Sequence, residues 1–238
     1  SNWLRSQKNI NYIFHFAAAT SVISSNQNKK KSYLTNVLGT KNLLKSIKQT
    51  KKRIFLFFPS TSHVYKFSKK PIFEKDLILP ISYYGKTKLL AEKEIRFCKN
   101  KNFKYFIGRI FSIFHHKQKK PFLYPTVKYK IKKIKSKRIY IENANCVRDF
   151  TNAEKLVKII LQIYKKKLSG TYNIGSGKGT SIKEFIYKNI SKKKEIITNN
   201  IFNVSVANIK KLKRAKIKIN WFMNKFIVVP CYHEYENI

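Results

Sequence analysis

Residues 53–60, RIFLFFPS, form a short apolar run that ends in a proline and a serine. Such an unbroken run is typical of a parallel strand that is buried on both faces. Similar runs, INYIFHFAAA and FKYFIGRIFSIF, occupy residues 10–19 and 103–114. Between the three runs lie two amphipathic segments, 33–49 and 84–100, whose apolar residues recur at helical spacing. The alternation of strand and helix predicts an α/β fold with a doubly wound parallel sheet.

The sequence changes character after residue 114. The segment 115–150 is rich in lysine and has fewer long apolar runs, so we expect a smaller, looser region beside the sheet. Further along, the sequence predicts a helix, a strand and two more helices, at 152–167, 170–177, 181–191 and 206–217. We therefore expect a main sheet domain in residues 1–115 and a smaller region in residues 116–238, from which about 150–177 return to the sheet.

The chain is strongly basic, with 52 lysines and arginines against 11 acidic residues and a formal charge of +41. Such a charge suggests a nucleic-acid partner or an anionic membrane. However, only seven of the basic residues are arginine, and the lysines run through every segment. Abundant Lys, Ile, Asn, Phe and Tyr with few Gly and Pro are the bias of an AT-rich coding sequence. A nucleic-acid partner is therefore not expected, although an RNA-binding or polyanion-binding protein stays an alternative.

Other features of the composition indicate a cytoplasmic protein. No apolar run approaches the roughly 18 residues of a membrane span. The three cysteines, Cys98, Cys146 and Cys231, are odd in number and far apart, which favours a reducing compartment and no metal site.

Several short motifs follow one another in a fixed order along the chain. They are HFAAATSV, NVLGTKNLL, FPSTSHVY, YYGKTKLLAE, GRIFS, VRDF and YNIGSG. In this order and spacing the set resembles the extended short-chain dehydrogenase/reductases, the NAD-dependent epimerase/dehydratase family that acts on nucleotide sugars. The resemblance implies a Rossmann-like sheet, NAD or NADP as cofactor, and a smaller substrate-binding region.

The motifs single out one tyrosine and lysine pair, Tyr84 and Lys88. With 14 tyrosines and 45 lysines in 238 residues, about 2.6 pairs at this spacing are expected by chance, so the spacing alone is no evidence. The resemblance implies that Tyr84 is the general acid/base and that Lys88 is its partner and a ligand of the nicotinamide ribose. We expect Lys88 and the nicotinamide to lower the tyrosine pKa.

The third catalytic residue implied by the resemblance is Thr61, which would hydrogen-bond the reacting oxygen. Ser60 and Ser62 flank it, and all three hydroxyls could instead satisfy backbone groups at the strand end. Dehydratases of the family carry an Asp-Glu pair directly after this threonine, whereas this chain has Ser62 and His63. Elimination of water is therefore not expected, and epimerisation or keto reduction is left.

The resemblance also implies binding residues around this group. It implies cofactor contacts from His15, Ala17, Ala18, Asn36 and Ser60, besides Tyr84 and Lys88. It implies substrate contacts from Ser62, Ser112 and Arg148, the last to a nucleotide diphosphate. His15 and Asn36 could equally be packing or capping residues, and Arg148 could form a structural pair with Asp149 or another carboxylate.

One part of the family pattern has no counterpart here. The glycine-rich loop that binds the pyrophosphate at the first strand–helix turn is not found before residue 10, so we expect about 60 residues of two strand–helix units to be absent.

We expect an NAD(P)-dependent epimerase or keto-reductase of a nucleotide sugar, serving polysaccharide or glycan precursor synthesis, with an inactive remnant as the alternative. We also expect a homodimer through the helices 33–49 and 83–100.

Overall fold

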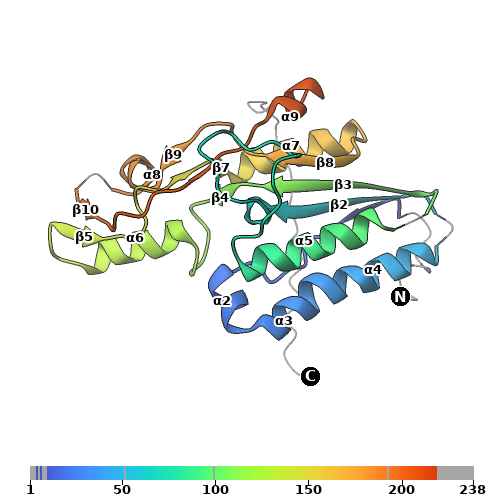
Figure 1. The fold of residues 1–238 in the computed structure, drawn as a ribbon, viewed down its shortest axis with the longest axis horizontal. Helices are drawn as coiled ribbons and strands as arrows, with labels where there is room; N and C mark the ends of the chain where they lie inside the picture. Colours follow the sequence, from blue (N-terminus) through green and yellow to red (C-terminus); the bar gives the residue numbers. More distant parts are fainter. Residues whose placement is uncertain are drawn as a thin grey trace.

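The computed structural model describes residues 4, 6, 10–50, 52–98, 100–191 and 193–218. Its centre is a parallel four-stranded sheet in the order β1-β2-β3-β8 (Figure 1). These strands are β1 (Tyr12–Phe14), β2 (Ile54–Thr61), β3 (Phe103–Ile110) and β8 (Gly170–Ile174). The predicted α/β parallel sheet is confirmed.

Helices cover both faces of the sheet (Figure 1). On one face lie α4 (Gly39–Lys48) and α5 (Tyr83–Arg96), and on the other lie α7 (Ala153–Lys165) and α9 (Lys210–Arg214). Side chains of β2 alternate between the two cores: Leu56 and Phe58 pack under α4 and α5, whereas Phe55 and Phe57 pack under α7 and α9. Both faces of the strand are buried, which explains its continuous apolar sequence.

The chain reaches α4 through a series of short helical segments. These are α2 (Val22–Gln27), α3 (Lys29–Tyr33) and a π-helical turn, η1 (Leu34–Leu38). π-Helical turns are rare and are frequently found at functional sites. In this chain the turn carries Asn36 and Val37, both of which are buried.

The smaller region has a core of its own, built from Val127, Ile139, Ala144, Ile186 and Ile196 among others. Its helices are α6 (Leu123–Lys133) and α8 (Ile182–Asn189). Its strands pair as β5 (Arg138–Tyr140) with β10 (Glu195–Ile197), and as β6 (Val147–Arg148) with β9 (Thr180–Ser181) and β11 (Val204–Ser205). None of the described helices is long and apolar enough to cross a bilayer.

Three predicted elements are shorter than expected. The predicted strand 103–114 divides at Phe111: Ser112–Phe114 leaves the sheet as β4 and pairs with β7 (Phe150–Asn152). In the predicted strand 10–19, only Tyr12–Phe14 pairs with β2, because the backbone of Ala19 is held by Asn36 instead. The predicted helix 206–217 is reduced to α9, because the backbone of residues 206–208 bonds to that of Ile72.

A buried ion pair joins α5 to the sheet. Arg109 of β3, 1% exposed, donates from Nε and Nη2 to both carboxylate oxygens of Glu92 at 2.8 to 3.2 Å. Glu92 is fully buried and also accepts from Ser60 of β2 and from Arg96, one turn further along α5. Arg109 uses Nη1 to donate to the Tyr65 hydroxyl at 2.7 Å. One carboxylate therefore fastens the helix to two neighbouring strands.

The Glu92 ion pair predicts a large loss of stability on charge removal. In Glu92→Gln, Arg109 keeps its charge in the interior without a carboxylate, and such a change costs about 3 kcal/mol or more. Glu94→Gln is the matched control, since Glu94 lies on the same helix and pairs with Lys41 at the surface, at 3.2 Å. It should change stability by less than about 1 kcal/mol. Urea unfolding at pH 7 measures both; equal losses in the two variants would contradict the role assigned to Glu92.

Candidate active site

The site is built where β2 ends and α5 begins. Thr61 is the last residue of β2, and its side chain caps the short helix η2 (Ser62–Val64) by accepting from the His63 N–H at 3.2 Å. Ser82 caps α5 in the same way, accepting from the Gly85 N–H at 3.0 Å. A Cβ on residue 85 would lie 2.2 Å from the His63 carbonyl oxygen. Glycine at this position therefore allows the first turn of α5 to lie directly on η2.

Tyr84, in that first turn, lies beside Thr61 and His63. The Thr61 side chain interacts with the Tyr84 phenol, and the Tyr84 and His63 rings meet edge to face with their centroids 6.0 Å apart. Burial raises the pKa of Tyr84 to about 12, and the Thr61 side chain only partly offsets this effect. Without a bound cofactor the pKa is therefore raised and not lowered, because desolvation outweighs the Thr61 hydrogen bond; the expected lowering by Lys88 together with nicotinamide stays a prediction for the ligand-bound protein. Tyr84 carries its proton at neutral pH.

Lys88 lies one helical turn beyond Tyr84 and is 2% exposed. Its ammonium lies 4.0 Å from the centroid of the Phe58 ring. Among the described residues it has no hydrogen-bond acceptor and no ion-pair partner. Burial lowers its pKa to about 7, although Glu92 acts in the opposite direction. A buried amine of this kind is a candidate ligand-binding group.

His15 follows β1 and also lies next to the Phe58 ring, with the two ring centroids 5.9 Å apart. Its Nε2 is 3.0 Å from the Thr40 hydroxyl, which itself donates to the Asn36 carbonyl at 2.8 Å. Since the threonine proton is used there, Nε2 must be the protonated nitrogen, and Nδ1 is an acceptor. Burial, reinforced by Lys88, lowers the pKa of His15 to about 4, so the ring is neutral at pH 7.

Asn36 holds in place the backbone of the segment that follows β1. Its amide oxygen accepts from the Ala19 N–H, and its amide nitrogen donates to the Ala19 carbonyl and to the Thr87 hydroxyl at 2.9 Å. Both amide hydrogens are thus used within the protein. Asn36 fixes the segment that carries Ala17 and Ala18, both at least partly accessible, and joins that segment to α5.

The three candidate serines have different environments. Ser60 is buried and its hydroxyl donates to Glu92, so its proton is not available to a ligand. Ser62 lies in η2 next to Thr61 and is half-buried. Ser112 lies in β4 opposite Phe150, and its side chain has no hydrogen bond to the described residues. Ser60 and Ser62 flank Thr61 directly in sequence, whereas Ser112 makes no hydrogen bond to a described residue of the site.

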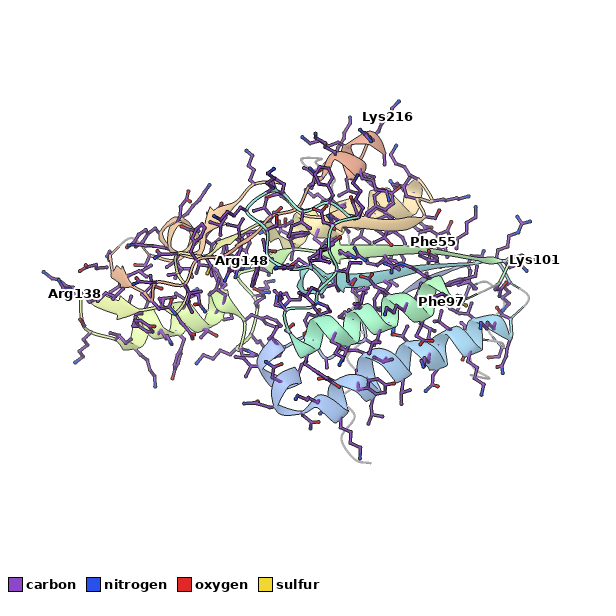
Figure 2. All side chains as sticks on the ribbon, in the orientation of Figure 1. Phe55, Phe97, Lys101, Arg138, Arg148 and Lys216 are labelled. Atoms are coloured by element: carbon purple, nitrogen blue, oxygen red, sulfur yellow. The ribbon has the colours of Figure 1, made fainter. Side chains whose placement is uncertain are left out.

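Arg148 lies between the sheet and the smaller region (Figure 2). Its Nη1 donates to two backbone carbonyls, those of Val147 and Asn203, and its guanidinium lies over the Phe67 ring. No described carboxylate pairs with it. The alternative of a pair with Asp149 is wrong, because the Asp149 oxygens accept from Ser176, Gly177 and Ala207.

Sequence reasoning missed the part that His63 plays in the site. Its Nδ1 lies 3.0 Å from the Ser82 hydroxyl, and burial together with Arg148 lowers its pKa to about 4. The ring therefore meets the cap of α5 and lies near enough to Arg148 to be affected by its charge. The sequence offered one signal, a histidine directly after the Thr61–Ser62 pair, but nothing to show that Arg148 would face it. Among the described residues, no His, Cys, Asp and Glu side chains gather into a metal site.

Known proteins with similar sequences were identified by comparison. Residues 3–225 match the family described as GDP-mannose 4,6 dehydratase. The UDP-glucose 4-epimerase of Halalkalibacterium halodurans is 28% identical over 198 residues, 74% of this chain and 59% of the relative. The GDP-6-deoxy-D-talose 4-dehydrogenase of Aggregatibacter actinomycetemcomitans is 30% identical over 180 residues, 72% and 58% respectively. The chain thus spans less than two thirds of the length of these relatives.

Solved structures show the same fold. The UDP-glucuronic acid 4-epimerase of Bacillus cereus, in complex with UDP-glucuronic acid and NAD, superposes with a TM-score of 0.76 at 23% identity. The superposition covers 88% of this chain and 70% of that one. The fold, the order of the motifs and the family match over most of the sequence agree, and the chain belongs to the GDP-mannose 4,6 dehydratase family of NAD-dependent epimerases and dehydratases.

Proposed function

We propose that this chain carries the catalytic residues of an NAD(P)-dependent nucleotide-sugar epimerase or keto-reductase. The observation that carries the proposal is the meeting of Thr61, Tyr84 and Lys88 at the carboxyl edge of the parallel sheet, where ligands of open α/β sheets bind. Relatives named for UDP-sugar and GDP-sugar substrates support the substrate class. Structures with NAD and with NADPH support the cofactor class.

The residues around Lys88 fit a ligand rich in hydroxyl and phosphate oxygens. The Lys88 side chain is 2% exposed and has no hydrogen-bond acceptor among the described residues, and a polar group in that state gains from any oxygen brought to it. Ala17 and Ala18 are small, so a ligand can approach their backbone closely. When bound there, nicotinamide accepts or donates the hydride. Lys88 would hold the ribose hydroxyls, and His15 Nδ1 offers a further acceptor.

Tyr84 and Thr61 serve the proton side of the reaction. At neutral pH the Tyr84 phenol is protonated, so it can donate its proton to the oxygen of a keto sugar, with Thr61 as a second hydrogen-bonding group. In the opposite direction a sugar hydroxyl must give its proton to the phenolate. The phenolate requires a cation nearby, and an oxygen-rich ligand that keeps Lys88 charged would provide one.

Arg148 suits the nucleotide diphosphate. Its guanidinium has no carboxylate partner among the described residues and lies near enough to His63 to lower the pKa of that ring. A diphosphate matches the hydrogen-bonding fork of the guanidinium.

Dehydration is disfavoured because Ser62 and His63 stand where an acidic pair would be needed, and His63 is neutral at pH 7. The product of the epimerase or keto-reductase would feed synthesis of a polysaccharide or glycan in the cytoplasm. The free buried thiols of Cys98 and Cys146 suit that compartment.

Removal of the Tyr84 hydroxyl tests the proposal. Tyr84→Phe should lower turnover of a UDP-sugar at least 100-fold, because the reacting oxygen loses its proton donor, while binding of the nucleotide sugar changes less than about threefold. Tyr83→Phe is the matched control at the adjacent position and should keep normal turnover. A steady-state assay with isothermal titration measures both effects. Normal turnover in Tyr84→Phe would rule out the assigned role.

Lys88 should weaken the fold at neutral pH. Its pKa falls from 10.5 in the unfolded chain to about 7 in the fold. Above pH 10.5 the lysine is neutral in both states, so it costs the fold no stability there. As the pH falls from 10.5 to 7, the unfolded lysine takes up a proton that the folded one does not, and the fold loses stability. One pKa unit corresponds to about 1.4 kcal/mol, so Lys88→Met should raise the free energy of unfolding at pH 7 by roughly 2–4 kcal/mol.

The gain in Lys88→Met should shrink as the pH rises toward 10, because the lysine of the unfolded chain then gives up its proton more easily and folding with a neutral Lys88 costs less. Lys86→Met, at an exposed position two residues away, should change stability by less than about 0.5 kcal/mol. Urea titrations across this pH range provide the measurement. Destabilisation in Lys88→Met that does not vary with pH would contradict a buried, unpaired ammonium.

We also propose that two copies pair through the outer sides of α4 and α5. Leu34 is 46% exposed and Phe97 is 74% exposed at this side of the molecule, and Figure 2 shows Phe97 at the end of α5. An interface of about 800 Å² per partner is the ordinary size for a stable pair. The exposed lysines of both helices and the charge of +41 oppose pairing at low salt.

Pairing should therefore depend on salt. We expect dimers above about 150 mM salt, where charges beyond about 8 Å are screened. Phe97→Lys should abolish pairing, whereas Phe202→Lys, at a 60% exposed position far along the chain, should not. Sedimentation velocity across a salt series measures this. Monomers at every ionic strength would exclude the dimer.

A further inference from the structure

A cleft lies on the face of the sheet opposite Tyr84 and Lys88. It has a volume of about 770 Å³ and lies between β7 and the start of α7, residues 176–180, α8 and the end of α9. This volume is in the range of small-molecule sites. None of the candidate catalytic, cofactor or diphosphate residues lines it, because α5 packs on the other face of the sheet.

Three phenylalanines form an apolar wall in this cleft. Phe150 and Phe185 stack with centroids 3.9 Å apart and planes 15° from parallel, and Phe114 meets Phe185 edge to face at 4.9 Å. Phe185 is buried, whereas Phe114 and Phe150 stay partly accessible. The cleft thus offers aromatic surface against which a flat or apolar group can pack.

The rim of the cleft is positive. Of the residues that the structure describes, five exposed lysines and no aspartate or glutamate line it: Lys155, Lys178, Lys188, Lys213 and Lys218. None of the five forms an ion pair with a described carboxylate. Asp149, which lies behind the loop, has its oxygens bonded to Ser176, Gly177 and Ala207. The field at the rim therefore favours an anion.

Thr151 distinguishes the cleft from the other lysine-rich surfaces of this chain. Thr151 lines the cleft, its side chain is 3% exposed, and its hydroxyl has no hydrogen-bond partner in the described part of the chain. Buried hydroxyls in native proteins nearly always have a partner. A ligand oxygen brought into the cleft by a small shift of this side chain would supply one.

We propose that this cleft is a second ligand site, which binds an organic phosphate with an aromatic body. The aromatic group packs against Phe114 and Phe150, and the phosphate binds the lysines of α7 and α9, with Thr151 as an additional hydrogen-bond donor. Because α8 belongs to the smaller region and α7 covers the sheet, such a ligand contacts both parts of the molecule. The site goes beyond the proposed catalytic function and does not depend on it.

The test uses 1-naphthyl phosphate, whose fluorescence reports binding, with the whole chain. We expect saturable binding of one molecule per chain. Phe114→Ala, Thr151→Val, Lys155→Gln and Lys213→Gln should each weaken binding at least threefold, and Lys155→Gln with Lys213→Gln together at least tenfold. Phe97→Ala on α5 and Lys45→Gln on α4 are the matched controls and should bind as the wild type does. Uncharged 1-naphthol should bind at least tenfold more weakly.

Three outcomes would overturn the proposal. Binding that resists every cleft substitution, or that does not saturate, would show only adherence to a basic surface. Equal binding of 1-naphthol would show an apolar patch with no anion site. Binding lost in Arg148→Ala but kept in the cleft variants would place the probe in the catalytic site. Thermal unfolding followed by circular dichroism checks each fold, and the two lysine variants, at exposed positions, carry the test if Phe114→Ala does not fold.

Discussion

The buried pair between Glu92 and Arg109 is the constraint on which the rest of the molecule depends. Two charged groups removed from water are stable only when each is fully hydrogen-bonded by the other and by its neighbours. That requirement fixes α5 against β2 and β3, since Ser60 of β2 and Arg109 of β3 converge on one carboxylate of the helix. Thr61 follows Ser60, and Lys88 precedes Glu92 by one turn. The interaction that holds the helix to the sheet therefore also sets where the candidate catalytic groups meet.

Around that fixed point, polar residues divide into two kinds. Asn36 and Ser60 have their hydrogen-bonding groups satisfied within the protein and serve to hold segments together. Lys88 and Arg148 are cations without carboxylate partners in the described part of the chain, in places where burial disfavours their charge. Charged groups left in this state reduce stability and persist where a ligand supplies the missing oxygen. Residues whose hydrogen bonds are satisfied within the protein therefore have a structural role, and those without a carboxylate partner are the candidates for binding a ligand.

Much of the fold could be predicted from the sequence, because strands covered on both faces must be continuously apolar and surface helices must be amphipathic. The break after β3 at Phe111 could not, since it depends on a backbone bond from Phe111 to Ile174 and on pairing with β7, which is distant in sequence. The motifs identified Tyr84, Lys88 and Thr61, but they could not show that burial raises the Tyr84 pKa, because the sequence does not show how deeply a side chain is covered. Likewise, nothing local indicated that His63 would face Arg148, or that Phe114, Phe150 and Phe185 would form one wall.

The catalytic role assigned to α5 depends on Lys88, a buried ammonium without an ion-pair partner in the described part of the chain, one turn beyond a protonated Tyr84. The most direct measurement is a pH titration of the Lys88 side chain by NMR in protein labelled with 13C-lysine, its signal assigned by its loss in Lys88→Met. The account predicts a midpoint near pH 7 in the free protein, and a lower midpoint in Glu92→Gln, where the charge that favours the ammonium is gone. A midpoint near 10.5, unchanged by Glu92→Gln, would contradict it.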